Sequence, residues 1–435
     1  MNILIAVPGY PPTHYAGAER VAERIARWLV AEGHNVEVFT IERLDDPDFR
    51  VETRREDGLT VHRVFYNTGT TTPYPGSYDS PQLATAIEQT LGRTRFDLVH
   101  IISGYLLAVP VIRAARRAGV PVVITLTEYW FLCPRLNLLH ADQTLCSGPE
   151  SDHKCTRCLA EDKRRYRLFS QKMPGLANAL WHMPVLSDLE AAVRTRRETL
   201  HRALEAADLV ISPSQFLIDK FAEFGFNTGR FVLIRHGLAS ADTPPAPAGR
   251  GPSGTLRLGY LGQIKPHKGA DLLVDAALPL LDAGQTLTVD LWGPDDEDPA
   301  YTTALKQRTA GSPAVRWRGR YQKSELRDIL ASLDALVVPS RWYENSPSVI
   351  WEAYAAGLPV IATRLGGMAE LVAHEHNGLL FALNDTEDLR RQLERLVREP
   401  DLLARLRAGI PPVKTDSDEA REIFNQYQHL LGLLT

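Results

Sequence analysis

The strongest constraint on the fold is a strand–loop–helix–strand pattern that occurs twice in the 435-residue chain. In each copy an apolar run leads through a glycine-containing loop into an amphipathic helix, and a second apolar run follows. The strands and helix of each copy fall at residues 3–7, 18–32 and 36–40, and again at 256–261, 270–281 and 286–292. Such units open doubly wound parallel sheets, so the sequence predicts an α/β fold of two tandem Rossmann-like domains.

A segment rich in Pro, Gly, Ala and Ser at residues 238–255 predicts a linker, and also a hinge, between these domains. The boundaries are then residues 1–238 and 256–417. An insertion at about 129–207 interrupts the first domain, and the sequence leaves open whether a last helix at 418–433 packs back on that domain. Further strands are predicted at residues 59–64, 98–102, 120–126, 209–212, 231–234, 315–317, 335–338 and 360–362, and a helix at 107–118.

Composition excludes several classes of protein. A net charge of −4 argues against a general nucleic-acid binder, and no apolar run is long enough to cross a bilayer. The first residues are typical of a strand rather than a signal peptide, and four cysteines in so long a chain are typical of reduced thiols. These features predict a cytoplasmic protein, with peripheral contact at the inner face of the membrane as an alternative.

The stretch from Ser340 to Glu370 predicts a binding site for a phosphate group. A strand at 335–338 is followed by a loop, by a helix with Ser346 as its N-cap and Pro347 at its first position, and by a strand at 360–362. Free N–H groups and the helix dipole at such a helix start attract an anion. Glu344 and Glu352 lie on either side of this start, and carboxylates suit sugar hydroxyls rather than phosphate.

These residues carry a family resemblance. The chain resembles retaining glycosyltransferases of the two-Rossmann-domain (GT-B) type, family 4, also called glycosyl transferases group 1. The resemblance covers most of the chain and rests first on Glu344 and Glu352, at Glu-x7-Glu spacing, with Gly366 and Gly367 after them. Supporting motifs are GQIKPHKG at 262–269, RHGL at 235–238 and GAER at 17–20.

The resemblance implies transfer of a hexose-type sugar from a nucleotide diphosphate sugar to a glycan, a lipid-linked saccharide or a small molecule, with retention and without a metal or other cofactor in the chemistry. The second domain would hold the donor and the first the acceptor, on either side of a cleft. Glu344 and Lys268 are the implied catalytic residues. The implied donor-binding residues are Gly17, Gly262, Gln263, Lys268, Glu344, Asn345, Ser346, Pro347, Ser348, Val349, Glu352, Gly366 and Gly367.

Two positions depart from the family pattern. Gln263 stands where members usually carry Arg, which removes a cation that Lys265 or His267 would have to replace. Thr127 and Glu128 stand where members often carry His-Asp. These departures motivate an alternative, a catalytically impaired protein that binds sugar nucleotides. A dinucleotide-dependent oxidoreductase is disfavoured, because neither glycine loop has G-x-G-x-x-G spacing.

The insertion holds two further patterns. Cys133, Cys146, Cys155 and Cys158 predict a structural zinc site, with His140 or His153 as substitute ligands, and with an iron–sulfur cluster or four ordinary thiols as the alternatives. Residues 163–172 and 194–202 are basic with interleaved apolar residues. They fit either an anionic membrane or lipid-diphosphate acceptor, or a solvated helix face.

Overall fold

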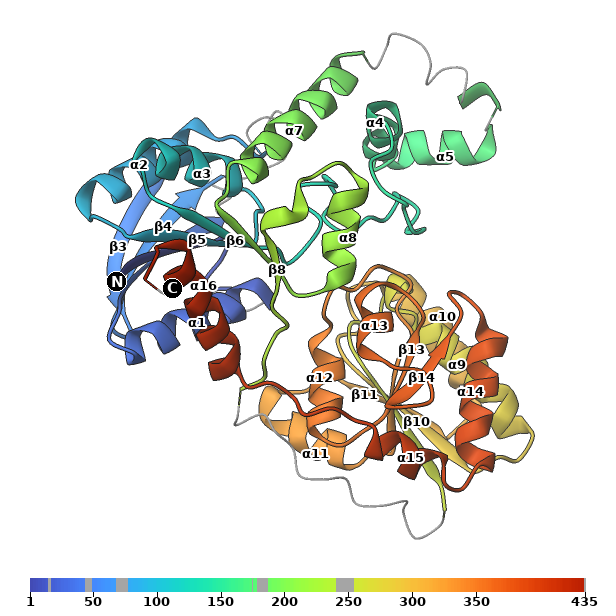
Figure 1. Ribbon diagram of the computed structural model, residues 1–435. Helices are drawn as coiled ribbons and strands as arrows, with labels where there is room; N and C mark the ends of the chain where they lie inside the picture. Colours follow the sequence, from blue (N-terminus) through green and yellow to red (C-terminus); the bar gives the residue numbers. More distant parts are fainter. Residues whose placement is uncertain are drawn as a thin grey trace. The chain divides into compact units, whose positions relative to one another are not determined.

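The computed structural model describes residues 1–14, 17–43, 49–67, 77–173, 175–177, 187–239 and 254–433. The chain divides into two compact units, Met1–Arg235 with Glu419–Thr435, and His236–Asp418 (Figure 1). Each unit is a parallel sheet with helices around it, so the predicted α/β fold with two Rossmann-like domains is confirmed. The predicted linker lies mostly outside the described residues, and its role as a hinge stays a prediction.

The first unit contains a sheet with strand order β3-β4-β2-β1-β5-β6-β7-β8 among the described residues. Every neighbouring pair is parallel except β3 and β4. Its strands are β1 Asn2–Val7, β2 Asn35–Arg43, β3 Arg50–Glu56, β4 Leu59–Tyr66, β5 Leu98–Ile102, β6 Val122–Thr125, β7 Leu209–Ser212 and β8 Phe231–Leu233. Strand β1 is buried from Ile3 to Val7, as expected for a central strand covered on both faces.

The helices of this unit follow the strand–helix alternation until the insertion. They are α1 Gly17–Ala31, α2 Pro81–Arg93, α3 Ala108–Arg117, α4 Asp152–Ala160, α5 Arg164–Lys172, α7 Ser187–Glu205 and α8 Gln215–Glu223. Ser80 and Ser214 cap α2 and α8, because each hydroxyl oxygen accepts a hydrogen bond from a first-turn N–H. Helices α4 and α5 lie within the predicted insertion.

Helix α16, Asp416–Leu430, packs on the first unit beside α1 (Figure 1). Ile423 and Tyr427 join the apolar core formed by α1 and the central strands. The Tyr427 hydroxyl lies 2.5 Å from Nδ1 of the fully buried His100 on β5. Burial lowers the pKa of His100 to about 3, so the ring is neutral and its Nδ1 can accept this hydrogen bond.

The second unit has strand order β11-β10-β9-β12-β13-β14 among the described residues, with every neighbouring pair parallel. Its strands are β9 Leu256–Leu261, β10 Leu287–Trp292, β11 Val315–Gly319, β12 Ala335–Val338, β13 Val360–Thr363 and β14 Gly378–Phe381. Its helices are α9 Ala270–Asp282, α10 Pro299–Thr309, α11 Leu326–Ala331, α12 Ser348–Ala355, α13 Gly366–Leu371, α14 Thr386–Arg398 and α15 Leu402–Ala408.

Two apolar cores cover the two faces of this second sheet. Alternate residues along one strand enter different cores: Ala335 and Val337 of β12 contact the core with α9 and α14, whereas Leu336 and Val338 contact the core with α11 and α12. This period of two is the strand geometry that the sequence pattern indicated. Among the described residues, no helix has the length and apolar character needed to cross a bilayer.

The strand order places a topological switch point in each unit. Chain connections leave β1 toward β2 on one side and reach β5 on the other, and β9 lies in the same way between β10 and β12. In open α/β sheets a ligand binds outside the carboxyl ends of the strands at this point. The loops that follow β1, β5, β9 and β12 are therefore the places to look for a site.

Candidate functional site

The loop after β12 holds a carboxylate that three donors fix through one oxygen. Glu344 is 8% exposed, and its Oε1 accepts hydrogen bonds from Lys268 Nζ at 2.6 Å, Trp342 Nε1 at 2.7 Å and Ser340 Oγ at 2.9 Å. Within the described part of the chain, Oε2 has no hydrogen-bond partner. The arrangement orients the carboxylate and leaves one oxygen to accept from a ligand hydroxyl.

Lys268 keeps Glu344 ionised. Burial raises the pKa of the Glu344 carboxyl, but the Lys268 charge and the three hydrogen bonds outweigh burial, so the pKa lies below its ordinary value. The ammonium also lies 4.9 Å from the centre of the Trp342 ring. An ammonium has three N–H donors and Glu344 takes one of them, so Lys268 retains donors for an anion.

Two glycines bring the loops of this site together. Gly269 follows the short 3₁₀ turn η5, Pro266–Lys268, with φ of +73°, and a Cβ there would overlap the carbonyl oxygen of Pro339. A Cβ at Gly367 would overlap the carbonyl oxygen of Asn345, and the Gly367 N–H donates to the Glu344 carbonyl at 2.8 Å. The predicted glycine positions thus permit close backbone approach on two sides of the Glu344 loop.

The start of the neighbouring helix differs from the prediction. Helix α12 begins at Ser348 with Pro347 as its N-cap, so Ser346 is not the cap. The Ser346 hydroxyl instead accepts a hydrogen bond from Trp351 Nε1 at 3.1 Å, because the indole of the first turn reaches back over it. The first-turn N–H groups at Ser348 and Val349 still lie at the helix end that favours an anion.

The second predicted carboxylate, Glu352, lies within α12 and is 8% exposed. The structure therefore buries both glutamates of the Glu-x7-Glu pattern, whereas solvated carboxylates would be exposed. The family resemblance implies that Glu352 binds the ribose hydroxyls of the donor, and this contact stays a prediction. The glycine that ends the helix, Gly357, has the expected positive φ of 70°.

The cations expected to replace the missing arginine are engaged elsewhere. Gln263 Nε2 donates to both oxygens of Glu297, at 3.1 and 3.2 Å, and Lys265 pairs with Glu297 Oε2 at 2.5 Å. Burial, followed by the Lys268 charge, lowers the pKa of His267 to about 4, so this ring is neutral near pH 7. Gly262 lies at the same bend, where its carbonyl oxygen closely approaches Gly293.

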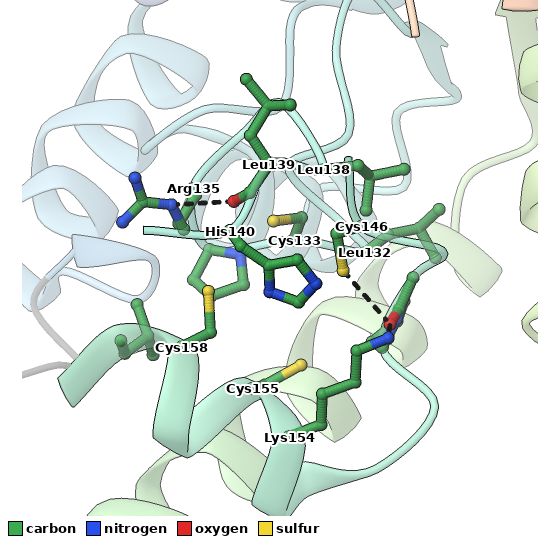
Figure 2. Close-up of a pocket in the computed structure, with 14 residues that line it drawn as sticks. Leu132, Cys133, Arg135, Leu138, Leu139, His140, Cys146, Lys154, Cys155 and Cys158 are labelled. Carbon is green, nitrogen blue, oxygen red and sulfur yellow. Dashed lines mark hydrogen bonds between the residues drawn. The ribbon is translucent and has the colours of Figure 1, made fainter. Parts of the chain in front are cut away.

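The four cysteines of the insertion line one small pocket (Figure 2). Cys155 and Cys158 project from α4, Cys133 and Cys146 face them from the preceding loop, and His140 lies on the same wall. Even so, no three His, Cys, Asp or Glu side chains in the described ranges are grouped so that they could hold a metal ion. The structure therefore does not support the predicted zinc site: all four are free thiols, and the Cys146 Sγ–H donates to the Gly148 carbonyl at 3.6 Å.

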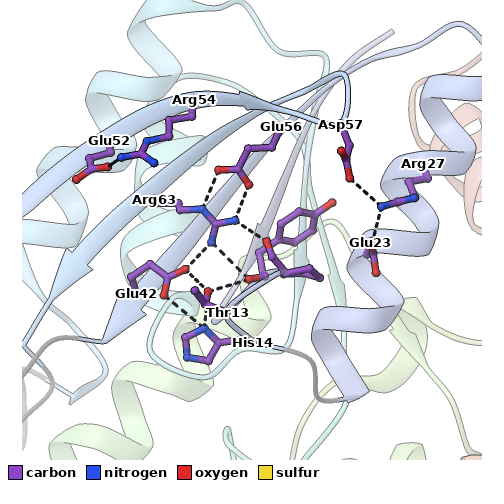
Figure 3. A network of polar contacts seen from close by, with 12 residues as sticks. Thr13, His14, Glu23, Arg27, Glu42, Glu52, Arg54, Glu56, Asp57 and Arg63 are labelled. Carbon is purple, nitrogen blue, oxygen red and sulfur yellow. Dashed lines mark hydrogen bonds and ion pairs between the residues drawn. The ribbon is translucent and has the colours of Figure 1, made fainter. Parts of the chain in front are cut away.

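In the first unit, a buried arginine on β4 braces the loop after β1 (Figure 3). Arg63 is 7% exposed and donates to the backbone carbonyls of Tyr10 and Pro11 and to the carboxylates of Glu42 and Glu56. Thr13 Oγ1 also donates to Glu42, at 2.5 Å. These bonds fix the loop that leads to α1.

Gly17 is the first residue of α1, and no heavy atom lies within 4 Å of the position that a Cβ would take there. The space beside this glycine is therefore open. Gly17 belongs to the first unit and the Glu344 loop to the second. Its predicted role remains a prediction.

A half-buried carboxyl, that of Glu128, lies just beyond the carboxyl end of β6, at the position of the family's His-Asp. Glu128 accepts hydrogen bonds from Ser103 Oγ at 2.8 Å and from the Trp130 N–H at 3.0 Å. Burial raises its pKa, and these hydrogen bonds only partly offset that effect. Glu128 thus links the loops after β5 and β6.

Comparison with family models settles the class of protein. The model described as "Glycosyl transferase 4-like domain" matches residues 16–237, and the model described as "Glycosyl transferases group 1" matches residues 255–399. The chain therefore belongs to the group 1, family 4 glycosyltransferases, as the sequence resemblance predicted.

Curated relatives match only part of the chain. A D-inositol 3-phosphate glycosyltransferase of Streptomyces bingchenggensis is 34% identical over 158 residues, 34% of this chain and 34% of that protein. A glycogen synthase of Mycobacterium tuberculosis is 32% identical over 198 residues, 45% of this chain and 46% of that protein. The chain thus aligns with less than half the length of these relatives.

Solved structures match the whole chain at low identity. Anabaena Alr3699/HepE in complex with UDP and glucose has a TM-score of 0.64 and 17% identity, over 98% of this chain and 99% of that one. Sucrose-phosphate synthase from Thermosynechococcus elongatus has a TM-score of 0.67 and 17% identity, over 100% of both chains. At this identity the likeness establishes the GT-B fold.

Sequence reasoning missed three residues that shape these sites. Ser340 and Trp342 flank Glu344 closely enough that a search for donors beside the carboxylate would have found them. Arg63 lies in β4 among the apolar residues Val61, Val64 and Phe65, and an arginine at such a position is a signal for a buried ion pair.

Proposed function

We propose that the protein transfers a hexose-type sugar from a nucleotide diphosphate sugar to a hydroxyl acceptor, with retention at the anomeric carbon. The observation that carries the proposal is the Lys268–Glu344 pair at the switch point of the second unit, with Glu344 Oε2 and two Lys268 N–H donors left for a ligand. A carboxylate oxygen and ammonium donors that lack partners among the described residues suit a ligand with hydroxyls and negative charge.

In this proposal each residue has a defined task. Glu344 Oε2 accepts from hexose hydroxyls, and Glu352 accepts from the ribose hydroxyls. Lys268 and the backbone near Ser346 to Val349, where every residue except Pro347 has an N–H, take the diphosphate, with Gly366 and Gly367 allowing it to approach the backbone. Gly262, Gln263 and Gly17 complete the proposed donor contacts.

The chemical step needs charge stabilisation more than a nucleophile. Cleavage of the bond from the anomeric carbon to the diphosphate oxygen leaves positive charge on the sugar and negative charge on the leaving group. Donors preorganised at the leaving oxygen lower this barrier, and loss of one such donor costs about 2.7–4 kcal/mol. Lys268 and the start of α12 are placed for that role, so the proposal assigns no task in the chemistry to a metal.

A thermal-shift screen with UDP-, GDP- and ADP-sugars, followed by calorimetry on the best nucleotide, tests donor binding. Glu344→Gln keeps the shape of the side chain but removes its charge, and it is expected to weaken binding of the nucleotide sugar at least tenfold more than binding of the free nucleotide. Glu387→Gln on α14, an exposed carboxylate of the same unit, is the matched control. Equal losses for both ligands would contradict contact between Glu344 and the hexose.

A second candidate, a sugar-nucleotide-binding protein with impaired catalysis, follows from one observation. Gln263 is uncharged and Lys265 is paired with Glu297, so among the described residues neither position supplies an unpaired cation in place of the family's arginine. Donor hydrolysis and transfer assays across several acceptors separate the two candidates. Binding without turnover supports the impaired protein, and product with retained anomeric configuration in its proton NMR spectrum supports the transferase.

A further inference from the structure

Helix α5 carries a basic, partly apolar exposed face within the insertion. Arg164, Arg165, Leu168 and Lys172 recur at helical spacing and are all exposed. Met173 and Leu176, just beyond the helix, are 50% and 49% exposed. We call these six residues the α5 face. Figure 1 shows α5 at the outer edge of the first unit.

The opposite side of α5 is attached to the fold. Tyr166 and Phe169 pack against a small cluster that contains the buried residues Ala160 and Ala177. Arg167 donates to the carbonyl of Ala141 at 3.1 Å. These contacts fix which side of the helix faces outward, so the exposure of the α5 face follows from its packing.

In the part of the chain that the structure describes, no carboxylate neutralises the cations of the α5 face. From 163 to 187 the sequence has five Lys or Arg residues and no Asp or Glu. Within the described ranges, Lys163, Arg164 and Lys172 form no ion pair. The second basic segment of the insertion behaves differently, because Arg194 and Arg197 on α7 both pair with Asp152.

We propose that the α5 face binds the anionic headgroups of a lipid bilayer and inserts Leu168, Met173 and Leu176 at the headgroup boundary. A cationic helix with exposed aliphatic side chains between its charges has the composition of an interfacial membrane helix. The cations supply attraction to anionic lipid, and the aliphatic side chains leave water on docking. The proposal goes beyond sugar transfer and does not depend on it.

Two other occupants fit the face less well. A nucleic acid offers phosphates to the cations but no apolar environment for three aliphatic side chains, and binding to single strands relies on aromatic stacking. An acidic protein would pair with the cations but would not require the aliphatic side chains. The experiment below therefore measures whether these side chains contribute to vesicle binding.

The test is flotation of the full-length protein with vesicles of phosphatidylcholine alone or mixed with phosphatidylglycerol. We expect binding only to the mixed vesicles and weaker binding at high salt. At about fivefold per cation near an anionic surface, Arg164→Gln/Lys172→Gln is expected to weaken binding about 30-fold. Leu168→Gln/Leu176→Gln is expected to weaken it roughly tenfold.

Arg391→Gln/Arg398→Gln removes the same charge from exposed positions on α14 of the second unit and serves as the matched control. Circular dichroism and nucleotide-induced thermal shifts check that each variant is folded. The proposal is overturned if the wild type does not float with the mixed vesicles, or if the control loses as much binding as the α5 variant. Unchanged binding of the aliphatic variant would also overturn it, in favour of a purely electrostatic partner.

Discussion

Both units carry an ion pair near their switch point, buried in the first unit and partly buried in the second, but the two pairs are built differently. In the first unit, Arg63 donates hydrogen bonds to Glu42, Glu56 and two backbone carbonyls, all of which are protein groups. In the second unit, the Lys268–Glu344 pair leaves one carboxylate oxygen and two ammonium donors without partners in the described residues. The difference indicates that the first pair fixes a loop and the second awaits a ligand.

The largest effect is expected where the pair is purely structural. Arg63→Met removes the guanidinium that pairs with the buried Glu42 and leaves it with Thr13 and, at 3.5 Å, His14, so the free energy of unfolding should fall by about 3–5 kcal/mol. Urea denaturation measures this loss. Arg54→Met, whose side chain is 68% exposed, should change stability by less than about 0.5 kcal/mol. An Arg63→Met protein as stable as the wild type would remove the basis for calling this pair a brace.

Lys268→Ala should affect the reaction more than the fold. Loss of a cation at the leaving diphosphate is expected to lower kcat by about 100–1000-fold, equivalent to 2.7–4 kcal/mol of barrier. Steady-state kinetics with the donor from the thermal-shift screen measure it. Lys306→Ala, an exposed lysine paired with Asp295, is the control. Wild-type kcat in Lys268→Ala would refute the assignment of this pair to the ligand.

A smaller loss is expected for the contact that joins α16 to β5. Tyr427→Phe removes the hydroxyl that lies 2.5 Å from His100 Nδ1 and leaves a buried acceptor unsatisfied. Stability should fall by about 1–3 kcal/mol, in the first unit. Hydrogen exchange should show the loss in β5 and α16, with α12 unchanged. Equal loss of exchange protection in both units would contradict the assignment of this contact to the first unit.

The smallest expected effect is the contribution of Glu344 to the pH dependence of stability. The pKa of Glu344 is held below its ordinary value, so its stabilising contribution is complete above that value of 4.5 and is lost only as pH falls through the lower folded pKa. Stability from this group should therefore be flat between pH 5 and pH 7. Lys268→Ala removes the charge that lowers the pKa of Glu344. The loss of stability on acidification should therefore begin at a higher pH in this variant. Chemical denaturation at a series of pH values measures the free energy of unfolding and checks both statements. The same acid dependence in the variant and the wild type would contradict the pairing of Lys268 with Glu344.

The sequence was sufficient to predict the two sheets, because most strands are short apolar runs between turn residues. It missed β3, an edge strand whose residues RVETRRE are mostly exposed and show no apolar alternation. It also missed β14, a buried run of four residues that is too short to distinguish from a helix segment.

Part of the site could also be predicted. Glu344 was proposed from its place beside a predicted helix start, whereas the proposed roles of Lys268 and the glycine pair came from the family resemblance. Their geometry was not predicted, because the contacts join loops 76 residues apart, and periodicity within one segment carries no information about such pairs. The thiol pocket shows the converse limit: spacing correctly grouped the cysteines but did not establish a metal site.

That pocket has a consequence for chemical reactivity. Burial and the neighbouring thiols raise the pKa of Cys155 to about 12, while burial raises that of Cys158 to about 11 despite the opposing charge of Arg135. The thiolate is the nucleophile, so at neutral pH these cysteines should react slowly with alkylating reagents while the insertion is folded. Alkylation should accelerate once the insertion opens, so the alkylation rate of Cys155 and Cys158 reports the unfolding of this segment.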